Sequence, residues 1–164
     1  MLRDKSLIPL SRQHQHALAL CVRIDRASPV GPADLEAWQG EIVQLAEGEI
    51  KSHFAAEEQV VLPAAAEFAE LRPLVEELIG EHAVLRDDFA CAEGRGMSAE
   101  RLAEFGQRLS AHIRKEERRL FERMQQMMSA EELAELGARL ENALEDAAQA
   151  CDVFAGKTKR PRLV

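Results

Sequence analysis

Apolar residues recur at intervals of three and four along most of the chain, the spacing that places them on one face of an α-helix. This pattern is interrupted where proline, glycine or serine occurs, at 27–34, 71–73, 93–100 and 127–132. It therefore predicts helices over 11–27, 33–67, 73–92, 98–127 and 129–153, and no strand. Because the connections are short, consecutive helices are expected to be antiparallel neighbours. We predict an all-α fold, an up-down-up-down four-helix bundle with an additional C-terminal helix.

Local signals refine two of these helices. Pro63 lies inside the helix over 33–67 and is expected to kink or end it, because proline has no N–H to donate. Ser129 and Glu132 have the spacing of a capping box, which begins a helix, whereas Ser98 has Arg101 at the matching position. The helix over 129–153 has an apolar row of its own, formed by Leu133, Leu136, Leu140 and Leu144. We expect it to cover a face of the bundle or to mediate a homodimer.

Polar residues replace apolar ones in the inward rows of three helices. The row of 98–127 reads Leu102, Phe105, Leu109, His112, Glu116, Leu120, Met124. The row of 33–67 reads Ile42, Ala46, Ile50, His53, Glu57, Val61. The row of 73–92 reads Leu71, Leu74, Leu78, His82, Leu85, Phe89. Histidine and glutamate four residues apart lie on one helix face, so two helices each direct an imidazole and a carboxylate inward.

The first helix contains two candidate histidines. The neighbours of His14 one turn on are Ala17, Leu18 and Cys21, and those of His16 are Ala19, Leu20 and Arg23. His14 has the more apolar row and is the better candidate for an inward position, with His16 as the alternative.

Two buried carboxylates require a positive partner, because burial disfavours an isolated charge. No lysine or arginine lies in the same rows at that depth, so a metal ion is the simplest partner. His14, His53, Glu57, His82, His112 and Glu116 are therefore the predicted metal ligands. Mixed nitrogen and oxygen donors without thiolate suit iron best, and manganese or zinc as alternatives.

The second glutamate of each pair is expected to have another role. Glu58 and Glu117 follow the inward glutamates directly and are turned from the inward row by about 100°. We expect them to face solvent or to support the ligands from outside.

Length, net charge and cysteine content indicate the number of domains, the partners and the cellular compartment of this protein. The chain has 164 residues, which suits a single domain, predicted over 1–153, followed by a basic and disordered tail at 154–164. The net charge of -8 argues against a nucleic-acid partner. Three scattered cysteines point to a reducing compartment, and no apolar run nears the length of a membrane span. We expect a cytoplasmic protein without membrane contact.

With these residues identified, the chain resembles the hemerythrin-like, or HHE cation-binding, domain family over roughly residues 8–127. The order of the motifs matches: His14, "HFAAEE" from His53, His82, and "HIRKEE" from His112. The resemblance implies a four-helix bundle with two non-heme iron ions, oxo- or hydroxo-bridged, in which Glu57 and Glu116 bridge and the four histidines are terminal ligands.

The chain also departs from the oxygen-carrying members of the family. Their third helix has an HxxxH pair, whereas here Leu78 and Arg86 flank His82 at four residues on either side. They use an aspartate five residues after a ligand histidine, where this chain has Glu117. One protein ligand fewer leaves more room at the metal for a small molecule.

The expected function is therefore a di-iron protein that binds or senses O2, NO or peroxide, in response to iron or redox state. A di-iron enzyme of peroxide or NO detoxification or of iron-centre repair is the alternative, and so is an interaction module with a vestigial site. Binding or sensing is favoured over catalysis because the sequence contains no nucleophile triad, GxGxxG motif or P-loop.

Overall fold

A computed structural model describes residues 2–154, and these residues form helices and connections without any strand. The helices are α1 Ile8–Ala27, α2 Pro32–Leu45, α3 Lys51–Ala56, α4 Leu62–Ala66, α5 Arg72–Glu93, α6 Ala99–Lys115, α7 Glu122–Met127 and α8 Ala130–Phe154. Three π-helical segments and one 3-10 turn join some of them: η1 Ala46–Ile50, η2 Glu57–Val61, η3 Ala69–Leu71 and η4 Glu116–Phe121. The all-α prediction is confirmed.

The short helices are parts of longer ones, because the π-helical segments continue the helix without a break. The described chain thus has five continuous helices, at 8–27, 32–66, 72–93, 99–127 and 130–154. Each bound agrees with the sequence prediction to within three residues. Pro63 does not end its helix, which continues to Ala66. Pro63 lies in the first turn after η2, where the hydrogen-bond register changes and a missing N–H is tolerated, as at a helix start.

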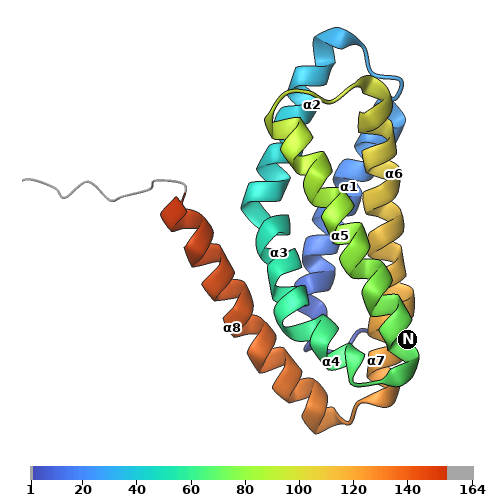
Figure 1. Cartoon of the computed structure of the whole chain (residues 1–164), viewed down its shortest axis with the longest axis vertical. Helices are drawn as coiled ribbons and strands as arrows, with labels where there is room; N and C mark the ends of the chain where they lie inside the picture. Colours follow the sequence, from blue (N-terminus) through green and yellow to red (C-terminus); the bar gives the residue numbers. More distant parts are fainter. Residues whose placement is uncertain (1, 155–164) are drawn as a thin grey trace, which may run out of the picture.

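The first four of these helices lie side by side along the long axis of the molecule and form a helical bundle (Figure 1). α1 packs on α6, and α2 packs on α5. α8 lies outside this bundle and packs against α3 and η2. In the apolar row of α8, Leu133, Leu136 and Leu140 are buried. This helix therefore covers one face of the bundle, which is one of the two roles predicted for it.

The predicted start of α8 is also confirmed. The backbone N–H of Ser129 donates to Glu132 Oε2 at 2.7 Å, and the N–H of Glu132 donates to Ser129 Oγ at 3.2 Å. Ser98 caps α6 through its hydroxyl alone, which accepts from the N–H of Arg101 at 3.1 Å. Further along α8, the helix crosses the N-terminal segment closely, since a Cβ on Gly137 would lie 2.8 Å from Ser6 Cβ.

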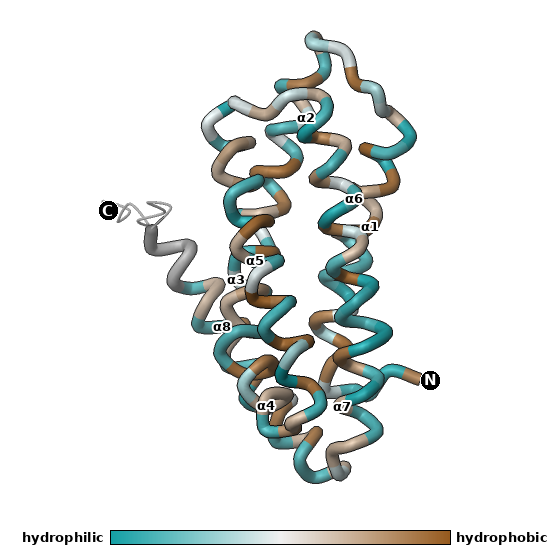
Figure 2. Tube along the Cα trace, turned by 45° about the vertical axis from the view of Figure 1, so that its right-hand side comes forward, coloured by the Kyte–Doolittle hydropathy of each residue, from teal (hydrophilic) through white to brown (hydrophobic). Residues whose placement is uncertain are grey.

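The hydrophobic core consists of two clusters separated along the bundle. One contains residues such as Leu10, Val60, Leu78 and Leu120, together with Leu136 and Leu140 of α8. The other contains residues such as Ala17, Phe54, Leu85 and Leu109. Figure 2 shows apolar and polar residues alternating along every helix of the bundle. Between the two clusters each of these four helices contributes a buried polar residue, and this layer is described below.

No helix in the described part is long and apolar enough to cross a membrane. Cys21 and Cys91 are free, and the side chain of Cys151 lies outside the described region. The predicted basic tail lies outside it as well, apart from Phe154, the last residue of α8.

Candidate metal centre

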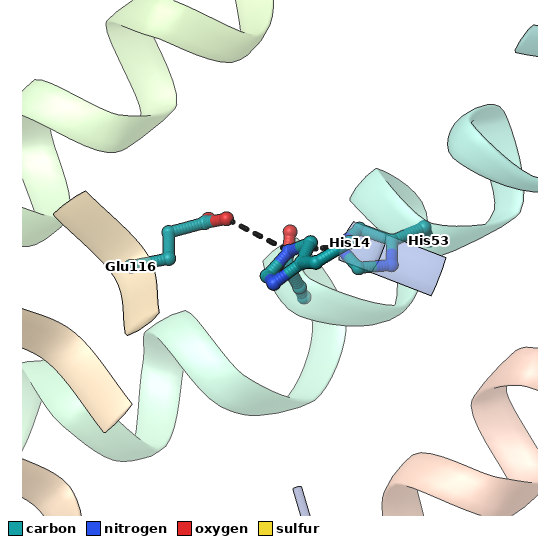
Figure 3. Close-up of side chains that lie close together, drawn as sticks. His14, His53 and Glu116 are labelled. Atoms are coloured by element: carbon teal, nitrogen blue, oxygen red, sulfur yellow. Dashed lines mark hydrogen bonds and ion pairs between the residues drawn. The ribbon is translucent and has the colours of Figure 1, made fainter. Parts of the chain in front are cut away.

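Six buried polar residues meet in the layer between the two apolar clusters. They are His14 of α1, His53 of α3, Glu57 of η2, His82 of α5, His112 of α6 and Glu116 of η4, each at most 2% exposed. All six are the residues that the sequence predicted to face inward. Figure 3 shows His14, His53 and Glu116 pointing toward one another from three separate helices.

One half of the layer is formed by His14 and His53 with one oxygen from each glutamate, and is called here the α1–α3 position. His14 Nε2 lies 3.0 Å from His53 Nε2 and 3.2 Å from Glu116 Oε2. His53 Nε2 lies 3.2 Å from Glu57 Oε1. These four side chains can each direct one donor atom at a common point.

The other half is formed by His82 and His112, and is called the α5–α6 position. His82 Nε2 lies 3.4 Å from Glu57 Oε2, and His112 Nε2 lies 3.3 Å from Glu116 Oε1. Both glutamates therefore belong to both halves, with one oxygen facing each. Each half thus offers two imidazole nitrogens and two carboxylate oxygens, a set that could hold a metal ion.

The outer nitrogen of each imidazole is held by an acceptor. Nδ1–H of His14 donates to Glu117 at 2.7 Å, that of His82 to Glu58 at 2.8 Å, and that of His112 to Glu81 at 2.9 Å. Nδ1–H of His53 donates to the amide oxygen of Gln13 at 2.8 Å. With the hydrogen on Nδ1, a neutral imidazole would present the lone pair of Nε2 to the centre, as a metal ligand must.

The duplicated glutamate of each motif is thereby explained. Glu57 and Glu116 point inward, while Glu58 and Glu117 reach across to a histidine on a neighbouring helix. Each pair stands at the start of a π-helical segment, a feature that is frequent at functional sites. Of the two roles expected for Glu58 and Glu117, these hydrogen bonds favour support of the buried histidines from outside.

Two supporting residues were missed by the sequence reasoning. Glu81 directly precedes His82 but bonds His112 on α6, and Gln13 directly precedes His14 but bonds His53 on α3. No spacing along one helix reveals a contact between two helices, so no local signal could have identified them.

The choice between the first two histidines is decided by burial. His14 faces the centre, whereas the side chain of His16 is 64% exposed and contacts Glu49 at 2.9 Å. Arg86 likewise faces away from the centre: its guanidinium donates to both oxygens of Glu58, at 2.7 and 3.1 Å. Leu78 is part of the apolar core, so neither residue four positions from His82 offers a donor.

Without metal, buried carboxylates and imidazoles compensate one another. Burial lowers the pKa of His14, but its contacts with the carboxylates of Glu116 and Glu117 outweigh it and raise the pKa to about 10. The pKa of His82 is likewise lowered by burial and raised overall, to about 10, by Glu116 and Glu57. Burial raises the pKa of Glu57, yet the charge of His53 and further histidine contacts hold it well below its usual value. The metal-free layer thus holds protons at neutral pH.

Several nitrogen and oxygen atoms at the centre of the layer nevertheless have no hydrogen-bond partner. They are both carboxylate oxygens of Glu57 and of Glu116, and Nε2 of His82 and His112. Buried polar atoms are rarely left in this state, so their convergence calls for a further partner. Within each half neighbouring donor atoms lie 3.0–4.0 Å apart, and the shorter of these separations match the roughly 3 Å between adjacent donors around an ion with bonds of about 2.1 Å. The residues therefore fit a metal-binding site.

A helical bundle with a buried His/Glu centre of this kind defines a class of metal-binding proteins. The family described as Hemerythrin HHE cation binding domain matches the chain over residues 9–124, more than half its length and all six of these residues. The chain belongs to this family. Comparisons with curated proteins and with solved structures gave no significant match.

Proposed function

We propose that this protein holds two non-heme iron ions in an up-down-up-down four-helix bundle and binds or senses O2, NO or peroxide there. The observation that supports it most is the sharing of Glu57 and Glu116 between two groups of buried donors. His14 and His53 would complete the α1–α3 position, and His82 and His112 the α5–α6 position. Such a centre would supply reversible binding or redox chemistry for a small ligand.

The donor set favours iron. Imidazole and carboxylate together, without thiolate, suit iron, and they are compatible with manganese or zinc. Cys21 offers no thiolate, because burial raises its pKa to about 12. Two imidazoles and two carboxylate oxygens at each position would leave an octahedral ion two further places for water or a ligand.

Burial restricts the ligand to a small one. Each of the six side chains is at most 2% exposed, so a substrate of more than a few atoms cannot reach the donors in this conformation. This supports a diatomic molecule or peroxide. It also favours binding or sensing over an enzyme acting on a larger substrate. The free thiols of Cys21 and Cys91 support a cytoplasmic location.

The test is the metal content per chain, measured by elemental mass spectrometry on protein produced with added iron. We expect about two irons per chain, and their loss when Glu57→Ala and Glu116→Ala are combined. His14→Ala should lower the iron content, whereas His16→Ala, on the same helix but exposed, should not. Unchanged iron in the double variant, or less than one metal ion per wild-type chain, would refute the proposal and favour an interaction module.

A second measurement separates binding from catalysis. The reduced, iron-loaded protein is mixed with an excess of peroxide or NO, and product is counted per chain. Reaction of about one equivalent supports binding or sensing, and sustained turnover supports the detoxification enzyme. Sedimentation of the intact chain tests the homodimer, which stays a prediction.

A further inference from the structure

The four imidazoles of the centre are not supported equally. In the α5–α6 position both outer nitrogens donate to carboxylates, His82 to Glu58 and His112 to Glu81. In the α1–α3 position only His14 donates to a carboxylate, Glu117. The partner of the fourth imidazole, that of His53, is the neutral amide of Gln13.

The supporting carboxylates are themselves held in place by cations. Arg86 donates two hydrogen bonds to Glu58, and Lys115 donates to Glu81 while also contacting Glu77 at 2.5 Å. Arg3 donates to Glu117 at 2.6 Å, and the neutral hydroxyl of Ser11 adds a second hydrogen bond to it at 2.7 Å. These contacts keep the three carboxylates ionised and directed at the imidazoles, so the difference between the positions is built into the structure.

A negatively charged acceptor at Nδ1 strengthens the binding of a metal ion at Nε2. It draws the Nδ1 hydrogen outward and makes Nε2 a stronger donor, and the loss of such a partner typically lowers metal affinity about 10–100-fold. A neutral amide orients the ring but adds no charge. The α5–α6 position has two such carboxylates and the α1–α3 position has one, while the bridging glutamates are common to both.

We propose that the two positions have different affinities, so that the α5–α6 position binds the first metal ion and the α1–α3 position binds the second more weakly, and that Gln13 sets this difference. The inference rests on the proposed two-ion centre. The protein would pass through a one-ion form as metal becomes scarce, with His14 and His53 free of metal. Loading of the weaker position would then report the supply of metal.

The experiment titrates the metal-free full chain with Co2+ without oxygen, following heat by calorimetry and the number of ions by native mass spectrometry. We expect two steps that differ about 10–100-fold in affinity. His53→Ala should leave the tight step and abolish the weak one. His112→Ala should abolish the tight step.

The exchange Gln13→Glu supplies the missing carboxylate. It should strengthen the weak step about tenfold or more and bring the two steps together. Gln15→Glu, which adds the same charge to an exposed position of the same helix, is the matched control and should change neither step appreciably. Glu81→Gln should instead weaken the tight step.

Three results would overturn this inference. They are two ions bound with equal affinity, a tight step that survives in His112→Ala but not in His53→Ala, and equal effects of Gln13→Glu and Gln15→Glu. None of these results would contradict a two-ion centre. Fewer than two cobalt ions per wild-type chain would instead refute the proposed centre itself, so the two failures are distinguishable.

Discussion

Metal binding to this centre should release protons, and the number can be worked out from the structure. His14 and His82 have pKa values raised to about 10 in the metal-free protein, so both are protonated at pH 7. An ion can bind Nε2 only when that nitrogen has lost its hydrogen. One of the two histidines belongs to each position, so each ion should displace about one proton.

The energetic consequence is large. Removing a proton at pH 7 from a group with a pKa of about 10 costs about 4 kcal/mol, at 1.36 kcal/mol per pH unit. This cost falls as the pH rises toward 10. The affinity of each ion should therefore increase about tenfold per pH unit between pH 6 and 8.

Calorimetry in two buffers of different ionisation enthalpy measures the protons released. We expect about one proton per ion, with Zn2+ or Co2+ as the probe. Glu117→Gln removes the negative charge of the carboxylate that raises the pKa of His14, so it should reduce proton release at the α1–α3 position. Release well below half a proton per ion, together with an affinity that does not change from pH 6 to 8, would refute the reasoning.

Three further predictions concern stability. The pKa values of His14 and His82 in the folded, metal-free protein exceed the ordinary 6.5. Their contribution to the free energy of unfolding is therefore fully present below pH 6.5 and is lost as the pH rises through about 10. Urea unfolding in the presence of a chelator should show lower stability at pH 10 than at pH 7. Gly137→Ala places a Cβ 2.8 Å from Ser6 and should cost about 1–3 kcal/mol, relieved in part by Ser6→Gly; full stability of the single variant would contradict the close crossing. Ser129→Ala removes the hydroxyl that caps α8 and should cost about 1 kcal/mol in thermal unfolding, whereas an unchanged melting temperature would count against the cap.

The helices and their inward faces could be predicted from the sequence because they depend on local periodicity. A spacing of three and four residues decides which side chains share a helix face, whatever that helix later packs against. The rows containing His53 with Glu57, His82, and His112 with Glu116 are buried throughout, as predicted. The need for a positive partner followed from the same rows, because buried carboxylates without lysine or arginine nearby are costly.

The tertiary structure decided everything that depends on contacts between helices. It placed His14 rather than His16 in the centre, directed one oxygen of Glu57 and of Glu116 to each position, and brought Gln13 to His53 and Glu81 to His112. Such contacts depend on how far each helix is rotated and shifted against its neighbour. A rotation of one residue changes the direction of a side chain by about 100°, and the pattern of apolar residues on a single helix is too coarse to specify it.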